Sequence, residues 1–352
     1  MLDTLTHALS GALAGRATAP RQARPDQLSL RERTWIGLLA GAAPDIDIVF
    51  TLFGHVSYLE NHRGITHSLL LMPLWAWLLA ALCAVALGRR YTWRAYYGVI
   101  LLALFVHILG DLITSYGTQI LAPFSNWAPG FNTTFIIDPW FSGVLLAGLV
   151  ASLYWRPRVG AALGLAAVTA LVLFQYTQYR TAVGVADGWA RAQGYSQYTA
   201  EAYPQPWSAF NWKLVVDHGD VYDMARVNLR RDTAPADPGD DAGLLRRLWA
   251  SYPPVAEAEW ERFAHFGDAS VEPLARDVWA QDEMAFFHWF ASYPALRQVD
   301  QRNGDQCVVF EDLRFRLEGM DSPFRYGMCR GSADGGWALY RMLDNGGRRP
   351  LE

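Results

Sequence analysis

The chain has 352 residues, a formal net charge of −4 and a mean hydropathy of +0.04, a length that allows two or three domains. Its basic residues are not gathered into one long stripe, so composition gives no case for a nucleic-acid partner. The near-neutral hydropathy conceals a division, because apolar runs fill the first half and the second half is typical of a soluble protein. We therefore predict a membrane domain over residues 1–180 and a soluble domain over residues 181–352.

The apolar runs predict an α-helical polytopic membrane domain of about four spans plus an N-terminal half-helix. Residues 2–15 have helical spacing but are too short for a span of about 20 residues. The run over 34–53 is long enough to cross, but Pro44-Asp45-Ile46-Asp47 interrupts it, which predicts a discontinuous helix that lines a protein cavity. Further apolar runs occupy residues 69–87, 96–113, 135–154 and 159–176.

Three arginine-bearing loops alternate along this half, at residues 16–33, 88–94 and 155–158. The positive-inside rule places such loops in the cytoplasm. The chain would then leave its last span on the outer side of the membrane. We therefore expect residues 181–352 to be extracytoplasmic.

The second half predicts a small α+β domain. Residues 212–222 are typical of a β-hairpin, and Asp217-His218-Gly219-Asp220 is interpreted as its turn and not as a metal site. Residues from about 242 to 298 are helix-like, for example over 244–249 and 279–290, and strand-like segments cover 308–317 and 337–342. The sequence leaves open whether Cys307 and Cys329 form a disulfide, because it does not give the Cα separation that a bridge requires.

His107 and Asp111 lie four residues apart in an apolar run, so both side chains project from one face of a helix. An ionisable residue inside a span costs roughly 2.5–3.5 kcal/mol on insertion scales, so this pair needs mutual partners, a wet cavity or a metal ion. Histidines and carboxylates drawn from several elements are typical ligands of a hydrolytic Zn²⁺, Mn²⁺ or Fe centre, or of a two-metal site. Under the predicted topology the further acids and histidines at the same outer depth are His7, Asp45, Asp47, His62, His67 and Asp138.

These residues also have structural interpretations, which the sequence leaves open. Asp45 and Asp47 could cap the half-helix that follows them. Asp138 precedes Pro139 and could be an N-cap with proline at the first helical position. His107 and Asp111 could form a buried structural pair or a proton relay.

Five motifs in combination resemble the YdjM-like inner-membrane proteins, a family described as membrane-bound metal-dependent hydrolases. The motifs are Thr6-His7, Gly41-Ala-Ala-Pro-Asp45-Ile-Asp47, His62-Arg63-Gly64-Ile-Thr66-His67-Ser68, His107-x-x-Gly-Asp111 with Thr114-Ser-Tyr-Gly117, and Phe135-Ile-Ile-Asp138-Pro139. The resemblance covers about residues 1–180. It implies a multi-pass protein of the bacterial inner membrane with a metal site on these His and Asp residues. The motif set is also distantly similar to that of zinc-dependent phospholipase C enzymes.

The leading hypothesis is hydrolysis of a lipid-linked or amphipathic ester or phosphoester at the outer face of the membrane. One or two divalent ions, Zn²⁺ first and Mn²⁺ or Fe as alternatives, would activate a water molecule and polarise the scissile group. Asp138 or His62 is the expected general base or the partner that orients a ligand histidine, and Arg63 would stabilise an oxyanion or bind a phosphate. The expected metal ligands are His7, Asp45, Asp47, His67, His107 and Asp111.

Two other classes of function remain open on the sequence. A transporter or lipid-binding membrane protein would use the His/Asp cluster as a proton relay or ion site. A scaffold would carry a structural metal and bind an envelope partner through its soluble domain. The enzyme hypothesis implies a membrane lipid or lipid-linked substrate as partner, and the oligomeric state is not predicted.

Overall fold

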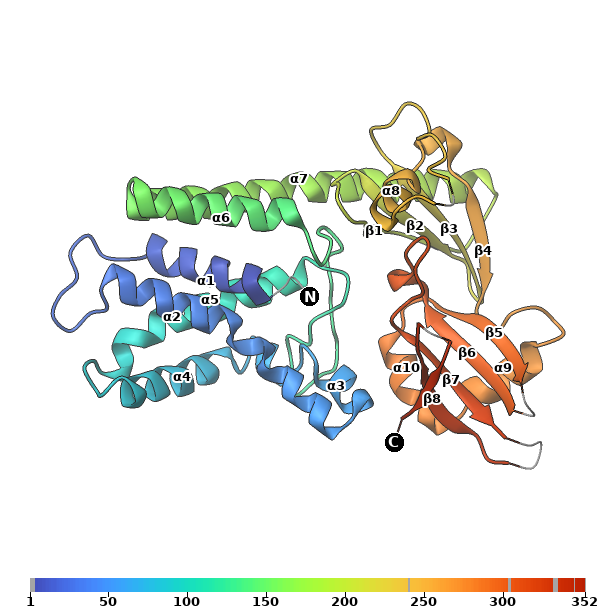
Figure 1. Cartoon of the computed structure of the whole chain (residues 1–352), viewed down its shortest axis with the longest axis horizontal. Helices are drawn as coiled ribbons and strands as arrows, with labels where there is room; N and C mark the ends of the chain where they lie inside the picture. The colour runs from blue at the N-terminus through green and yellow to red at the C-terminus, as the bar shows by residue number, and fades with distance from the viewer. Residues whose placement is uncertain (1–3, 240, 303–304, 332–334, 345, 352) are drawn as a thin grey trace. The chain divides into compact units, whose positions relative to one another are not determined.

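The computed structural model describes residues 4–239, 241–302, 305–331, 335–344 and 346–351. It forms two compact units, drawn in Figure 1. The first unit contains the described residues up to Thr51 together with Asn61–Thr177. The second unit contains Leu52–Glu60 and the described residues from Gln178 onward.

The first unit is helical, and its helices α1, α2, α4 and α5 pack against one another in the pairs α1–α2, α1–α5, α2–α5 and α4–α5. Its elements are α1 (Thr4–Ala17), α2 (Leu30–Ala42), the 3₁₀ helix η1 (Ala43–Phe53), η2 (Ile65–His67), α4 (Met72–Ala86), α5 (Trp93–Leu112), α6 (Pro139–Tyr154) and the first part of α7 (Pro157–Ala192). The short helix α3 (His55–Asn61) separates η1 from η2 along the chain.

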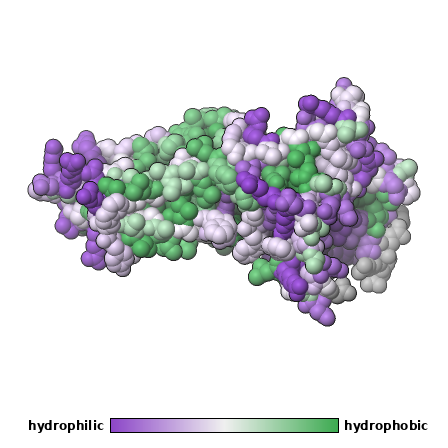
Figure 2. Space-filling model, turned by 90° about the horizontal axis from the view of Figure 1, so that it is seen from above, coloured by the Kyte–Doolittle hydropathy of each residue, from purple (hydrophilic) through white to green (hydrophobic). Residues whose placement is uncertain are grey.

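Three helical stretches in the described residues are long and apolar enough to cross a membrane: Leu30–Phe53, Trp93–Leu112 and Pro157–Ala192. A fourth exists if His55–His67 and Met72–Ala86, bent by 81°, count as one broken span. Pro139–Tyr154 is a shorter apolar helix of 16 residues. Large apolar side chains lie exposed on these helices, and Figure 2 shows them as a hydrophobic zone beside a hydrophilic end. The predicted number of spans therefore stays a prediction, whereas the apolar helical character of the first half is confirmed.

The helices α1 and α2 pack closely because glycines face each other. A Cβ atom on Gly37 would lie 2.3 Å from the carbonyl oxygen of Gly11, and one on Gly41 would lie 2.5 Å from that of His7. Small residues allow the backbones of membrane helices to approach in this way. The close approach holds His7 of α1 against the last turn of α2.

The interruption predicted at Pro44 is present as a change of helix type. The helix α2 ends at Ala42 and the chain continues as the 3₁₀ helix η1. Proline supplies no N–H group for an α-helical hydrogen bond. In η1 Asp47 is buried at 1 % exposure, while Ile46 and Leu52 are 68 % and 79 % exposed.

The second unit contains two antiparallel sheets. The first has the order β1 (Thr199–Pro204), β2 (Asn211–Asp217), β3 (Val221–Asn228) and β4 (Trp260–Ala264), and the second has the order β5 (Pro294–Arg302), β6 (Asp305–Asp312), β7 (Arg325–Arg330), β8 (Ala338–Met342) and β9 (Arg348–Pro350). The remaining elements are α8 (Leu244–Ala250), η3 (Val255–Glu257), α9 (Glu272–Trp279), η4 (Asp282–Met284), α10 (Ala285–Phe290) and η5 (Leu313–Phe315). The helix expected over 279–290 is present as η4 and α10. The helix-like expectation for the whole of 242–298 was wrong at β4 and at the start of β5, because these segments pair with β3 and β6.

The last turns of α7 pack on the first sheet. Ala182, Ala186 and Ala190 are fully buried in one cluster with Trp212 and Leu214 of β2. Alanines four residues apart lie on one face of a helix. The apolar run over 159–176, expected as the last span, lies within α7, and this alanine face continues the helix beyond the run to Ala192.

The structure confirms the predicted hairpin and joins the two cysteines. Strands β2 and β3 are antiparallel, with Asp217 opposite Tyr222 and the turn at residues 218–220 between them. Cys307 of β6 lies opposite Cys329 of β7. Their Cα atoms are 4.1 Å apart and the two residues form a disulfide.

Candidate metal centre

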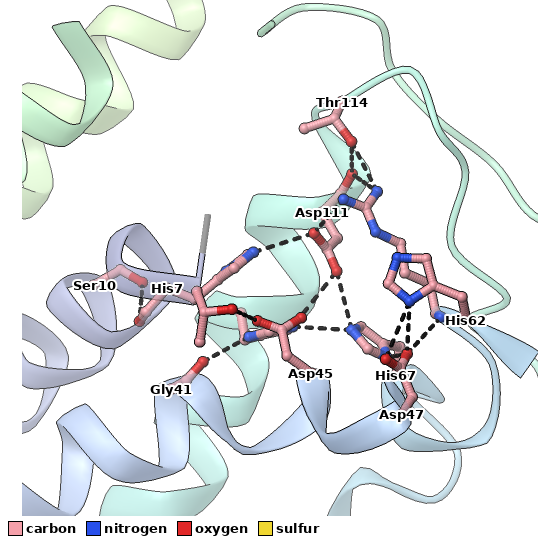
Figure 3. A network of polar contacts seen from close by, with 12 residues as sticks. His7, Ser10, Gly41, Asp45, Asp47, His62, His67, Asp111 and Thr114 are labelled. Atoms are coloured by element: carbon pink, nitrogen blue, oxygen red, sulfur yellow. Dashed lines mark hydrogen bonds and ion pairs between the residues drawn. The ribbon is translucent and has the colours of Figure 1, made fainter. Parts of the chain in front are cut away.

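Five ionisable side chains from four elements converge inside the first unit. Four of them are labelled in Figure 3. They are His7 of α1, Asp45 of η1, His67 of η2, and His107 and Asp111 of α5. We call these five residues the His/Asp cluster. The three histidines and Asp111 are each at most 1 % exposed, so solvent does not hydrate their polar atoms.

The ligating atoms of the cluster lie at short separations. His67 Nε2 is 3.0 Å from His107 Nε2 and 3.1 Å from Asp111 Oδ2. His107 Nε2 is 3.5 Å from Asp111 Oδ2 and 3.7 Å from Asp45 Oδ1. Two groups have all their ligating atoms within 4.8 Å of one another: His67, His107 and Asp111, and His7, Asp45 and His107.

A backbone hydrogen bond fixes the tautomer of His107. Its Nδ1 lies 2.6 Å from the carbonyl oxygen of Gly41, which can only accept, so Nδ1 carries the proton and Nε2 presents a lone pair. His67 Nδ1 lies 2.9 Å from Thr66 Oγ1 and 3.6 Å from Asp47 Oδ2. A proton on that Nδ1 leaves the Nε2 lone pair of His67 directed at the Nε2 lone pair of His107. Two lone pairs 3.0 Å apart repel, and a shared cation relieves this repulsion.

The donor set fits a divalent transition metal. Zn–N bonds of about 2.0–2.1 Å in a tetrahedral site place two ligand nitrogens about 3.3 Å apart, close to the observed separation. Asp111 Oδ1 is paired with Arg63 Nη2 at 2.7 Å, but His7 Nε2 and Asp111 Oδ2 are buried without a hydrogen bond of acceptable geometry. Buried polar atoms of this kind are costly unless another partner is present. An ion at the cluster would supply that partner.

Formal charge also favours a cation. Three carboxylates lie in or beside the cluster, on Asp45, Asp47 and Asp111, and the buried Arg63 adds one positive charge. With neutral histidines the surroundings carry a charge of −2, which a divalent ion balances. Uncompensated charge of this size is expensive in an apolar helical unit.

Asp111 contacts both sides of the cluster. Its Oδ1 lies 3.2 Å from His7 Nε2 and 2.7 Å from Arg63 Nη2, while Oδ2 faces His67 and His107. A carboxylate with its two oxygens turned to different histidines can bind one ion or bridge two ions.

Asp47, His62 and Arg63 form a layer beside the cluster. Both carboxylate oxygens of Asp47 lie 3.1 Å from His62 Nδ1, and Oδ2 accepts a hydrogen bond of 2.8 Å from the Arg63 backbone N–H. Arg63 has a positive φ of 54°, and its Nη1 donates to Thr114 Oγ1 at 2.8 Å. Asp47 belongs to neither of the two candidate metal groups among the described residues.

Comparison with known proteins identifies the family. A family model described as YdjM inner membrane protein matches residues 1–182, more than half of the chain. The chain belongs to the YdjM inner membrane protein family. This membership and the apolar helices make it a membrane protein.

The chain, whose residues 1–182 we call the YdjM domain, is also similar to the uncharacterized protein YfhP of Bacillus subtilis (strain 168). The two are 34 % identical over 163 residues, which is 44 % of this chain and 46 % of YfhP. The match therefore spans less than half of the length of that relative. No solved structure matches the chain.

Asp138 of the YdjM domain acts as a helix cap. Its Oδ1 accepts hydrogen bonds from the backbone N–H groups of Trp140 and Phe141 at the start of α6, and its Oδ2 accepts one of 2.7 Å from Gln175 of α7. This is the N-cap alternative that the sequence left open. Among the described residues, the side-chain hydrogen bonds of Asp138 join α6 to α7 and do not reach the His/Asp cluster.

Sequence reasoning missed two groups at the candidate centre and one partner of Asp138. The Gly41 carbonyl orients His107 and the Thr114 hydroxyl binds Arg63, and neither has a sequence signal beyond lying in a motif. Gln175 is 3 % exposed and donates to Asp138. Its signal was visible, because it is the one amide in the apolar run over residues 159–176.

Proposed function

We propose that this YdjM protein is a membrane-bound metal-dependent hydrolase of a lipid-linked or amphipathic ester or phosphoester. The observation that carries the proposal is the approach of the His67, His107 and Asp111 ligating atoms to within 4.8 Å of one another at a buried position. His7 and Asp45 complete the donor set, and Thr4 Oγ1 holds Asp45 by a hydrogen bond of 2.8 Å to Oδ2.

The five residues of the His/Asp cluster would hold one or two divalent ions, with Zn²⁺ first and Mn²⁺ or Fe as alternatives. A divalent ion lowers the pKa of a coordinated water and polarises a carbonyl or phosphoryl group. The protein residues supply orientation. Gly41 holds the His107 ring, and Asp47 and Thr66 hold the His67 ring, so that the lone pairs point to one place before substrate arrives.

His62 is the proposed general base. Asp47 lies 3.1 Å from its Nδ1, which keeps the proton on Nδ1 and makes Nε2 the basic nitrogen. The ring centres of His62 and His67 are 6.4 Å apart, a distance that one water molecule can bridge. Arg63 is proposed to neutralise charge that develops on the reacting oxygen, because its guanidinium already lies beside Asp111.

The surface beside the cluster supports an amphipathic substrate. The helix η1 carries the buried Asp47 and exposes Ile46, Ile48 and Val49 at 68 %, 59 % and 44 %. An exposed apolar patch next to a polar site is typical of a lipid or membrane contact. The substrate is proposed to reach the ions from the lipid side of η1.

The second unit is proposed to be extracytoplasmic. The three arginine-bearing loops favour this topology, and a disulfide between Cys307 and Cys329 is typical of an oxidising compartment. The hydrolase would then act at the outer face of the inner membrane.

The test is a hydrolysis assay on the full chain in mixed micelles with Zn²⁺ or Mn²⁺, using phosphodiester and carboxylic-ester lipids. We expect turnover that a chelator removes and added metal restores. His62→Gln should lower kcat by about 10²–10⁴-fold while metal content stays unchanged. A metal-loaded protein that hydrolyses no ester of either kind would contradict the enzyme and favour the ion-site or proton-relay alternative.

A further inference from the structure

A cavity of about 600 Å³ lies at the arginine-rich end of the first unit, and the proposed hydrolase function does not use it. It is lined by the start of α2, the end of α4 and the start of α5. Its volume is within the usual range of about 300–1,000 Å³ for small-molecule sites. We call it the arginine cavity.

The walls of the arginine cavity combine apolar and cationic groups. Trp35, Leu39 and Leu87 line it and are 56 %, 62 % and 56 % exposed. Arg31 and Arg90 line it as well, and both are exposed. An acyl chain suits the first set and an anionic group suits the second.

The acid in the cavity is already paired. Glu32 Oε1 lies 3.1 Å from Arg90 Nη1, and both its oxygens are within 3.3 Å of the Tyr91 hydroxyl. Glu32 also accepts the Ser29 backbone N–H in a capping box. The side chain of Arg31 makes no hydrogen bond or ion pair within the part of the chain that the structure describes. Arg31 is therefore the uncompensated charge of the cavity.

The position of the arginine cavity in the unit matches a membrane boundary. The loops that carry arginines, 18–29, 87–92 and 155–156, lie at one end of the first unit in Figure 1, and Figure 2 shows that end as hydrophilic beside the hydrophobic zone. A basic pocket between membrane helices at such a boundary is suited to an anionic lipid headgroup. Trp35 is of the residue type that is enriched at this depth.

We propose that the arginine cavity binds an anionic phospholipid of the surrounding bilayer. The phosphate would lie between Arg31 and Arg90, and an acyl chain would lie along Trp35, Leu39 and Leu87. The charge complementarity with Arg31 favours an anionic lipid over a zwitterionic one. The site is separate from the His/Asp cluster, and its occupant is bound and not hydrolysed there.

The test is native mass spectrometry of the detergent-purified full chain, titrated with phosphatidylglycerol or with phosphatidylcholine of the same acyl chains. We expect the wild-type protein to bind phosphatidylglycerol more tightly. Arg31→Gln should weaken this binding roughly fivefold and Arg31→Gln/Arg90→Gln about 25-fold, and the preference should disappear. Arg31→Gln removes no contact of the fold, so its result stands even if the double variant is unstable.

The matched control is Arg21→Gln/Arg24→Gln, which removes two charges from the loop that precedes α2, outside the cavity. It should bind phosphatidylglycerol within twofold of the wild type. An equal loss in this control would show that binding is diffuse electrostatics and would overturn the site. Equal affinity of the wild type for the two lipids, or displacement of bound lipid by free glycerol phosphate, would overturn it as well.

Discussion

The residues of the His/Asp cluster show how hydrogen bonds prepare a site for a cation. His107 is fixed by a carbonyl group and His67 by a hydroxyl and a carboxylate. Both rings are then held with the same nitrogen turned toward Asp111. Fixed tautomers and a surplus of two negative charges make the centre selective for a positive ion before any ion binds.

Asp47 and Asp111 are predicted to differ as metal-site residues. Asp47 contacts His62, the Arg63 backbone and the far nitrogen of His67, whereas Asp111 faces the Nε2 atoms directly. Asp47→Asn should therefore weaken metal affinity about 10–100-fold, as loss of an orienting partner does. Asp111→Asn should abolish stoichiometric binding. Competition titration against a chromogenic chelator measures both.

The metal affinities of Asp47→Asn and Asp111→Asn show whether Asp47 is a metal ligand or only orients one. If Asp47→Asn loses metal as completely as Asp111→Asn, then Asp47 is itself a ligand, as the sequence predicts. If it loses none, Asp47 has no part in orienting His67. The charge is removed equally in the two variants, so each is the control for the other.

At the scale of the elements, the site depends on how closely α1 approaches α2. A methyl group on Gly41 would meet the His7 carbonyl oxygen at 2.5 Å, and the Gly41 carbonyl orients His107. One backbone position therefore determines both the helix packing and the orientation of a ligand.

Gly41→Ala should separate α1 from α2 and move His7 and His107 apart. Overpacking of this kind costs about 1–3 kcal/mol, so we expect a lower thermal midpoint and a loss of bound metal. Gly98→Ala and Gly143→Ala are the controls, because a Cβ atom there meets nothing within 4 Å. Thermal unfolding with metal analysis of the same samples measures the effect. Normal metal content in Gly41→Ala would contradict the coupling of packing and site.

The sequence could predict those elements and residues whose signal is periodic or chemically unusual. The pair His107 and Asp111 was visible because charge in an apolar run is rare, and the hairpin of β2 and β3 was visible from its turn residues. The roles of Asp45 and Asp47 could not be separated, because neighbouring residues of the same type differ only in which way η1 turns them. The Gly41 carbonyl was invisible, because every residue carries one. The extension of α7 depends on a distant sheet, so local hydropathy did not predict it.

At the scale of the molecule, a helical YdjM domain is joined through α7 to a second unit of two antiparallel sheets. The family match ends at residue 182, close to the point where α7 enters the second unit at Gln178. The first unit carries the His/Asp cluster and the arginine cavity. The second unit carries the disulfide of the chain.

The proposed topology predicts which introduced cysteines a membrane-impermeant thiol reagent reaches in intact spheroplasts, in a Cys83→Ala background because Cys83 is a free thiol. Ser196→Cys in the second unit should be labelled, and Arg89→Cys in an arginine-bearing loop should be labelled only after lysis. Both positions are exposed, so accessibility in the fold is matched. The native Cys307 and Cys329 are joined and should not react before reduction. If only Arg89→Cys were labelled in intact spheroplasts, the topology would be the opposite of the proposed one.

The central claim is that the His/Asp cluster holds metal, and elemental analysis of the purified full chain tests it most directly. The wild type should contain about one or two equivalents of Zn, Mn or Fe. A monodisperse His107→Ala/Asp111→Ala variant should contain almost none, and His288→Ala, which changes a histidine of the second unit, should match the wild type. Absence of metal from the wild type after reconstitution, or full metal content in the double variant, would contradict the account.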